Sequence, residues 1–175
     1  MMARFSRVFA MVAVLAITPV FAGEQGEDKR SVVPQTPEWK KLTSLVGEWE
    51  GMMDVDGKPT PIKLEIRMTG DGSAIMHWMD KDSPHEMVTM IHPDGKRLLA
   101  THYCAAHNQP RMAMVLSKAP NQVAFQFVDG TNIGPSEGYM KGVVFTFIDT
   151  DRHEEAWTHS SSPTAAVFSY TRKKK

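Results

Sequence analysis

The sequence has little of several things, and each shortage excludes a class of protein. Only one cysteine, Cys104, occurs in 175 residues, so no internal disulfide can form and a disulfide-stapled fold is excluded. Basic and acidic residues balance at 20 each, which leaves no basic excess for binding nucleic acid or an anionic membrane surface. We therefore expect no nucleic-acid partner.

Long apolar runs are also missing. The run from Val8 to Ile17 is too short for a membrane span, which needs about 20 residues. It follows the positive Arg4 and Arg7 and precedes Pro19, which is the layout of a secretory signal peptide. Residues 1–22 are predicted to be cleaved after Ala22, leaving no stable membrane span; an uncleaved anchor helix is the alternative.

The rest of the chain divides into a short leader and one domain. Residues 23–35 carry charges of both signs without periodicity, which predicts a flexible leader. Residues 36–175 are numerous enough for a single domain with a sizeable core. A lone cysteine in a secreted protein suits a bacterial periplasm better than a disulfide-dense animal secretion, so we expect secretion into a periplasm.

A short helix is predicted before the first strand. Thr36 is a suitable N-cap, and Pro37 suits the first helical turn. Apolar residues then recur at helical spacing, so the helix is expected over Pro37 to Val46, with Gly47 ending it.

From Gly47 onward the periodicity changes to two. Ile62, Leu64 and Ile66 alternate with charged residues, which predicts a strand with one buried face. Turn signals follow at 54–57, 69–72, 80–84, 93–95, 106–110, 118–121, 129–138, 149–152 and 160–163. Nine connectors predict about ten strands, and an antiparallel up-and-down β-barrel would hide their edges. A β-sandwich has the same local signals and is the alternative.

The stretch from Leu98 to Met112 holds the densest set of reactive side chains. His102 and Cys104 are two apart on a predicted strand, so they face the same side. Such a pair suits Zn²⁺, copper or haem iron if a third ligand such as His159 or His107 joins it. The alternatives are a contact to a small ligand, or a buried thiol beside a hydrogen-bonded core histidine.

Three polar residues follow at the end of this strand. Asn108, Gln109 and Arg111 form a donor-rich loop that would suit a polar headgroup at a barrel mouth. Alternatively, they hold their own turn together, as asparagine often does.

The segment 153–159 alternates in the same way. His153, Glu155, Trp157 and His159 share one face, and if that face is interior, Trp157 and His159 would line a cavity beside His102. The opposite face carries residues too small to decide, so an exterior stripe stays open.

The segment Leu45-Val46-Gly47-Glu48-Trp49 resembles the Gly-x-Trp signature that begins the first strand of calycin barrels, the lipocalins and fatty-acid-binding proteins. The resemblance implies an all-β, calycin-like barrel in which Gly47 and Trp49 belong to a closed end. It also implies an arginine from the last strand packing over the tryptophan, and Arg172 stands at that place.

Four further segments carry a closer resemblance, namely 85–90, 101–104, 108–112 and 127–132. They resemble a family of uncharacterised secreted bacterial proteins with a lipocalin-like domain of unknown function. The resemblance runs from about Glu38 to Arg172 and implies a fold without an established activity. His107 stands where that family is expected to have glycine, so no role for His107 is implied.

These observations lead to one main expectation about function. We expect a barrel that binds a small, mostly apolar molecule in its interior, with His102, Cys104, Trp157 and His159 near it. Alternatives are a haem- or metal-handling barrel using His102, Cys104 or His159, and an enzyme with His102 as acid or base. A purely structural barrel would instead have its interior filled by methionines and Phe125, Phe127, Phe145 and Phe147. No cofactor is firmly implied, and the oligomeric state is not readable from the sequence.

Overall fold

The computed structural model describes residues 33–55 and 58–174. The predicted signal peptide and nearly all of the predicted leader lie outside these residues. The described elements are α1 (Pro37–Ser44), β1 (Gly47–Val55), β2 (Lys58–Thr69), β3 (Ala74–Met79), β4 (Met87–Asp94), β5 (Arg97–Tyr103), β6 (Gln109–Val115), β7 (Gln122–Thr131), β8 (Met140–Phe147), β9 (Arg152–His159) and β10 (Ala165–Arg172). Within this part of the chain, no helix has the length and apolar character that a bilayer crossing requires.

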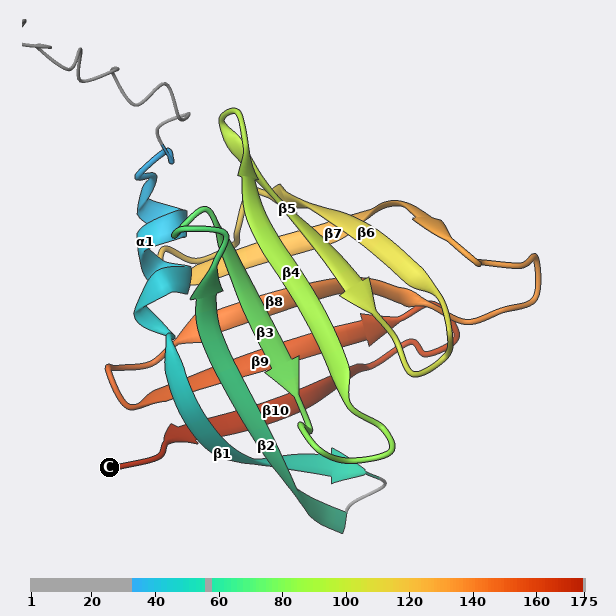
Figure 1. Ribbon diagram of the computed structural model, residues 1–175. Helices are drawn as coiled ribbons and strands as arrows, with labels where there is room; N and C mark the ends of the chain where they lie inside the picture. The colour runs from blue at the N-terminus through green and yellow to red at the C-terminus, as the bar shows by residue number, and fades with distance from the viewer. Residues whose placement is uncertain (1–32, 56–57, 175) are drawn as a thin grey trace, which may run out of the picture. The chain divides into compact units, whose positions relative to one another are not determined.

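The ten strands form a closed barrel (Figure 1). Each strand pairs antiparallel with its neighbours in sequence, and β1 pairs with β10 to close the ring. This arrangement confirms the predicted up-and-down β-barrel of about ten strands behind a short helix. It also rules out the β-sandwich.

The two ends of the barrel differ. The closed end is the one where α1 lies and β1 begins (Figure 1). Its connections are residues 45–46, 70–73, 95–96, 116–121 and 148–151. The opposite end carries the connections 80–86, 104–108, 132–139 and 160–164. We call it the open end because none of its described residues forms a helix that would cover it.

α1 begins as predicted and ends earlier. The Thr36 hydroxyl accepts a hydrogen bond from the Trp39 backbone N–H at 3.1 Å, and Trp39 and Leu42 are buried in the core. The helix ends at Ser44, and Val46 is 38% exposed, so the predicted extension to Val46 was wrong. At the adjoining Gly47 the φ of +146° suits glycine alone.

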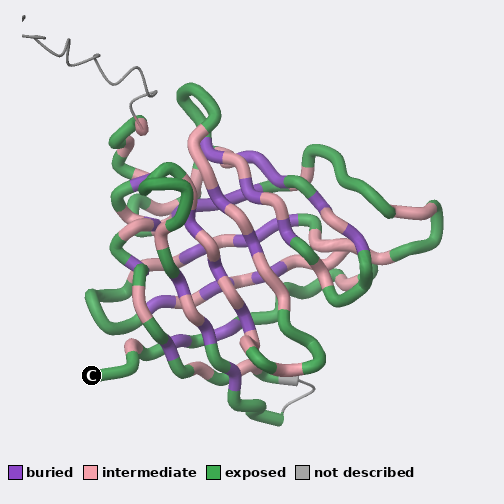
Figure 2. The backbone as a smooth tube through the Cα atoms, in the orientation of Figure 1, coloured by how far each residue is buried: buried purple, intermediate pink, exposed green. Residues whose placement is uncertain are grey.

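Buried positions recur along the strands of the barrel (Figure 2). The largest buried side chains have almost no exposed surface. Phe125, Phe145 and Met112 are at most 1% exposed, whereas Phe127 and Phe147 are half-buried. The apolar core further includes Trp49, Leu64, Ile66, Ile75, Met79, Ile91, Leu98, Val123, Val143, Trp157, Phe168 and Tyr170. Space for a ligand therefore has to be sought toward an end of the barrel.

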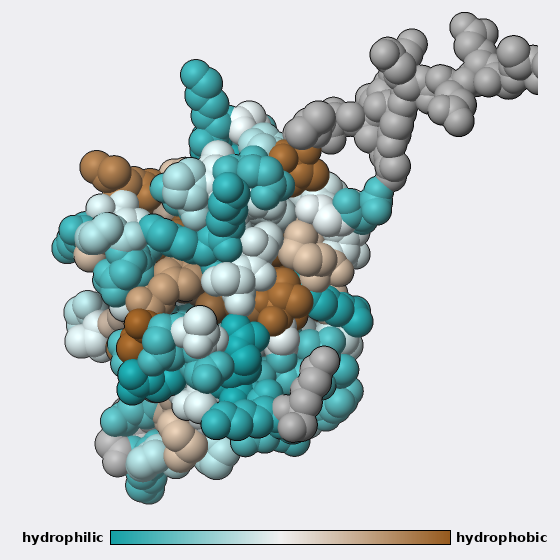
Figure 3. Space-filling model, turned by 90° about the vertical axis from the view of Figure 1, so that its left-hand side faces the viewer, coloured by the Kyte–Doolittle hydropathy of each residue, from teal (hydrophilic) through white to brown (hydrophobic). Residues whose placement is uncertain are grey.

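The surface on the α1 side is mostly hydrophilic, with hydrophobic residues scattered over it (Figure 3). The exposed hydrophobic residues Val46, Leu116 and Ile148 belong to connections at this closed end. Scattered apolar residues of this kind are ordinary on soluble surfaces and mark no site by themselves.

Candidate functional site

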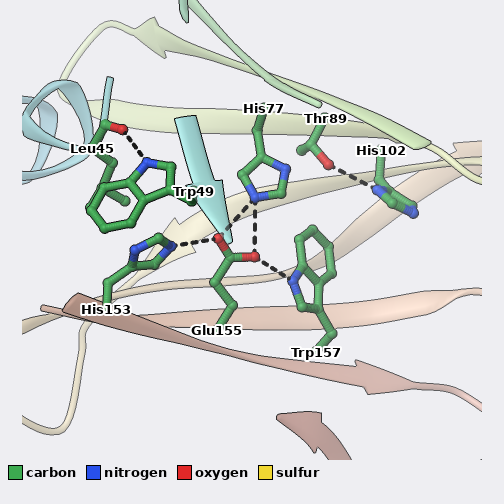
Figure 4. A network of polar contacts seen from close by, with 8 residues as sticks. All are labelled: Leu45, Trp49, His77, Thr89, His102, His153, Glu155 and Trp157. Atoms are coloured by element: carbon green, nitrogen blue, oxygen red, sulfur yellow. Dashed lines mark hydrogen bonds and ion pairs between the residues drawn. The ribbon is translucent and has the colours of Figure 1, made fainter. Parts of the chain in front are cut away.

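A carboxylate lies at the centre of the barrel interior. Glu155 of β9 is fully buried, and its two oxygens contact Nε2 of His77 at 2.9 and 3.0 Å. Nε2 of His153 lies 3.1 Å from one of these oxygens, and Nε1 of Trp157 donates to the other at 2.9 Å. Figure 4 shows the three rings arranged around the carboxylate. Nitrogen donors thus surround an anion that has no access to water.

Two opposing effects act on this carboxyl group. Burial alone would raise the pKa of Glu155, because the charged form loses its hydration. Charge on His77 and the hydrogen bonds from His153 and His77 outweigh burial and hold the pKa well below its usual range. Glu155 is therefore ionised at any physiological pH.

The strand alternation places these residues. Positions 75, 77 and 79 of β3 are buried and their neighbours are half-buried, so His77 points inward. On β9, His153, Glu155 and Trp157 are all buried, which settles the question of its inner face. The cluster is packed by aromatic rings, since Trp49 meets His153 edge-on at 4.4 Å between ring centres and Tyr170 stacks on it at 5.0 Å.

His102 occupies a second polar position inside the barrel. It is 1% exposed, its Nδ1 lies 2.8 Å from the Thr89 hydroxyl, and its ring centre is 5.1 Å from that of Trp157. Its Nε2 has no hydrogen-bond partner among the described residues. In Figure 4 this nitrogen lies on the side of the ring turned away from Thr89 and from the Glu155 cluster.

His102 is uncharged near neutral pH. Burial, and to a smaller extent the charge on nearby His77, together lower the pKa of His102 to about 4. A general acid or base works best with a pKa near the operating pH. This pKa therefore does not favour an acid–base role for His102, one of the alternatives that the sequence leaves open.

Cys104 lies just beyond the last residue of β5 and is half-buried. Its backbone N–H donates to the Asn108 carbonyl, and the exposed His107 completes the turn with a positive φ of 62°. Among the described residues we find no group of three His, Cys, Asp or Glu side chains placed to hold a metal ion. His102, Cys104 and His159 are thus not arranged as a metal centre.

The three polar residues after Cys104 point in different directions. Asn108 is fully buried, and its Nδ2 donates to the Gly138 carbonyl at 2.9 Å. Gln109 Oε1 accepts hydrogen bonds from Thr131 and Asn132, both at 2.8 Å. Both side chains therefore hold the neighbouring loop in place.

Arg111 lies on the outer face of β6 and pairs with the exposed Asp129, to which its Nε donates at 2.8 Å. The pairing raises the pKa of Arg111 and lowers that of Asp129. The mouth-facing orientation expected for Arg111 is therefore not the one that the structure has.

His159 lies at the open end of β9 and is half-buried. Its Nδ1 is 2.6 Å from the Ser161 hydroxyl. The ring also covers Gly138, because a Cβ on that glycine would come within 2.2 Å of the His159 Cε1. His159 and Asn108 thus both fix the backbone at Gly138.

The closed end is built around Trp49. The indole N–H of Trp49 donates to the Leu45 carbonyl at 2.8 Å, and the Arg172 guanidinium lies 4.1 Å from its ring centre. A Cβ on Gly47 would lie 2.7 Å from Nη1 of Arg172, so a side chain there would collide with it.

Several inner positions near the open end are only partly covered. Met53, Met87 and Met140 are half-buried and pack against the core. Ala166 is exposed although its strand partner is the buried Trp157.

A groove of about 740 Å³ lies elsewhere on the molecule and is lined by residues such as Glu50 and Asp80. Neither His102 nor Trp157 lines this groove.

His77, Thr89 and Tyr170 belong to the interior cluster but were not singled out from the sequence. His77 had a readable signal, since it alternates with Ile75 and Met79 on a strand. Thr89 likewise precedes Ile91 at the same spacing. Nothing local indicated that His77 would meet Glu155.

These residues define a closed ten-stranded up-and-down barrel with a buried anion at its centre. Comparison with protein families and with curated proteins finds no match. Among solved structures, Rv2717c from M. tuberculosis is similar at 13% identity, over 79% of this chain and 99% of that one, with a TM-score of 0.49. A redesigned β-barrel is similar at 11% identity, over 77% and 96% of the two chains, with a TM-score of 0.38. The fold assignment itself rests on the strand pairing.

Proposed function

We propose that this protein is a secreted, periplasmic, calycin-like barrel that binds one small, mostly apolar molecule at its open end. We place it with the uncharacterised lipocalin-like proteins that its sequence resembles. His102 and Trp157 form the floor of the site, and Met53, Met87 and Met140 form its rim. The unpartnered Nε2 of the buried His102 is the observation that carries this proposal.

The open end suits a ligand better than the middle of the barrel. At most 1% of Phe125 and Phe145 is exposed, so the centre offers no space without large rearrangement. The rim methionines are half-buried, and methionine is flexible enough to repack around different apolar shapes. The closed end has no such freedom, because Trp39 and Leu42 are packed into the core.

A fluorescent apolar probe tests this proposal. N-phenyl-1-naphthylamine is uncharged and brightens in an apolar site. We expect it to bind the purified protein, and Met87→Lys to weaken binding at least about tenfold, because a charge would replace apolar rim surface.

Met68→Lys is the matched control for this experiment. Met68 is also a half-buried strand methionine packed on the core, but it lies near the closed end of β2. Met68→Lys should bind the probe with an affinity within about twofold of that of the wild-type protein. Equal losses in both variants, or no binding to the wild-type protein, would refute the proposal.

Two further measurements address compartment and ligand identity. Mass spectrometry of protein from its own host should show a mature chain beginning at Gly23, as cleavage after Ala22 requires. Native mass spectrometry of the same material should show an added mass that is lost on unfolding.

A further inference from the structure

Two buried polar atoms near the open end have no partner among the described residues. They are Nε2 of His102 and Oδ1 of Asn108, whose side chains are 1% and 0% exposed. Buried polar atoms without partners are rare in native proteins and raise the question of what satisfies them.

The two atoms belong to one hairpin. β5 and β6 pair as far as Thr101 and Arg111, so His102 lies opposite Pro110. The ladder resumes where the Cys104 backbone N–H donates to the Asn108 carbonyl. Asn108 is therefore one inner-face step beyond His102 toward the open end, and such diagonal neighbours lie about 7–8 Å apart at Cα.

The partners of each side chain identify its free atom. The Thr89 hydroxyl has no hydrogen bond among the described residues except that to His102 Nδ1. Thr89 is satisfied as a donor only if Nδ1 accepts, which places the imidazole hydrogen on Nε2. Asn108 donates through Nδ2 to the Gly138 carbonyl, so its free atom is an acceptor oxygen. The pair thus consists of one donor and one acceptor.

The surrounding charges disfavour an anionic partner. The described buried residues include no lysine or arginine, and the Glu155 carboxylate is only two positions from Trp157 on β9. Burial keeps His102 uncharged at neutral pH. A carboxylate at this place would lose its hydration, and the charge on nearby His77 is already paired with Glu155.

We propose that the open end selects a neutral headgroup with both a hydrogen-bond acceptor and a donor, a hydroxyl or a primary amide, held between His102 Nε2–H and Asn108 Oδ1. The inference rests on the proposed function and adds the chemical class of the ligand. Asn108 and His102 thereby determine specificity, while the rim methionines take the apolar part.

Displacement of N-phenyl-1-naphthylamine by a matched set of eight-carbon compounds tests this inference. Octan-1-ol and octanamide carry both functions, heptyl methyl ether carries only an acceptor, and octanoate carries a charge. We expect the alcohol and the amide to compete at least about tenfold better than the ether and octanoate, since only they satisfy both protein atoms.

Variants of His102 show whether the preference comes from this pair. His102→Phe should reduce the alcohol-to-ether ratio to near one, and His102→Gln, which keeps an N–H, should retain part of it. The ratio compares two ligands on the same variant, so a change in stability does not affect it. If His102→Phe does not fold, the test is the comparison of the wild-type protein with His102→Gln, whose alcohol-to-ether ratio should be lower.

The outcomes separate this inference from the proposed function. If the probe binds but all four compounds compete equally, the headgroup inference fails and the apolar site stands; an internal water bridging the two atoms would give this result. If the probe does not bind the wild-type protein, the proposed function itself fails.

Discussion

The guanidinium of Arg172 lies over the ring of Trp49, 4.1 Å from its centre. Its three nitrogens also donate to the backbone carbonyls of Ser44, Val46 and Thr150, each at 2.9 Å. One side chain of the last strand therefore joins the end of α1, the α1–β1 connection and the β8–β9 connection. It satisfies carbonyls that a helix end leaves without partners.

Arg172→Ala should lower the free energy of unfolding by about 2–3 kcal/mol, because directed hydrogen bonds from a charged group and the ring contact are lost together. Arg172→Lys should recover only part of this, since an ammonium lacks the planar fork. Urea unfolding of the two variants and of the wild-type protein measures these changes in the free energy of unfolding. Arg67→Ala is the control, because Arg67 also lies over a tryptophan, Trp78, but at 5.5 Å and with 52% of its side chain exposed. A similar loss in the control would contradict the special role of Arg172.

Glu155→Gln should destabilise the protein by about 3 kcal/mol or more. The amide turns an N–H toward donors from His77, His153 and Trp157 that now meet carboxylate oxygens. Glu154→Gln, on the other face of the same strand, should change stability by less than about 0.5 kcal/mol. Chemical denaturation decides, and a loss below about 1 kcal/mol for Glu155→Gln would show that the cluster is not held as described.

Stability should fall with acidification because of His102. Its pKa in the folded protein is about 4, below the ordinary 6.5, so the unfolded chain binds the extra proton between these values. Stability is therefore complete above about pH 6.5 and is lost progressively as the pH falls toward 4, by about 3 kcal/mol in total. The free energy of unfolding, measured at several pH values, should therefore fall more steeply with acidification in the wild-type protein than in His102→Gln. The same pH dependence of unfolding in both proteins, or an ordinary pKa of His102 measured by NMR, would contradict this prediction.

Gly51→Ala should cost about 1–3 kcal/mol, because Tyr170 lies directly on this glycine. A Cβ there would come within 2.4 Å of the Tyr170 ring and 2.8 Å of the Ser169 carbonyl oxygen, and the backbone contact cannot give way. Gly134→Ala is the control, since its Cβ would meet only the flexible Glu137 side chain, at 3.2 Å. Thermal unfolding should show a clear drop for Gly51→Ala alone; two equal drops would point to a general effect of alanine.

Much of the fold was readable from local chemistry. The Thr36 cap marked the start of α1, and the alternation at Ile62, Leu64 and Ile66 marked β2, because both signals act within a few residues. The sequence predicts that α1 ends at Val46, because this apolar residue continues the helical spacing, whereas the helix ends at Ser44. Just beyond this end, Arg172 of the last strand lies close to Gly47, and no local pattern shows this contact.

The site was readable only in part. The contact between His77 and Glu155 joins positions 78 residues apart, and only barrel closure brings them together. The inner face of β9 could not be assigned because Ala156 and Thr158 are too small to indicate which side is buried. Arg111 was expected at the mouth from its loop composition, although it lies between the buried Pro110 and Met112 and strand alternation turns it outward.

Closure of the ring through the β1–β10 pair has a consequence for damaged or shortened forms of the protein. Losing the last strand would uncover the backbone of β1 and of β9 at once, giving two unpaired edges instead of none. Unpaired edges are templates for strands of other molecules. Proteolysis within residues 165–172 is therefore expected to produce self-association as well as loss of stability, and size-exclusion chromatography of the cleaved protein would detect it.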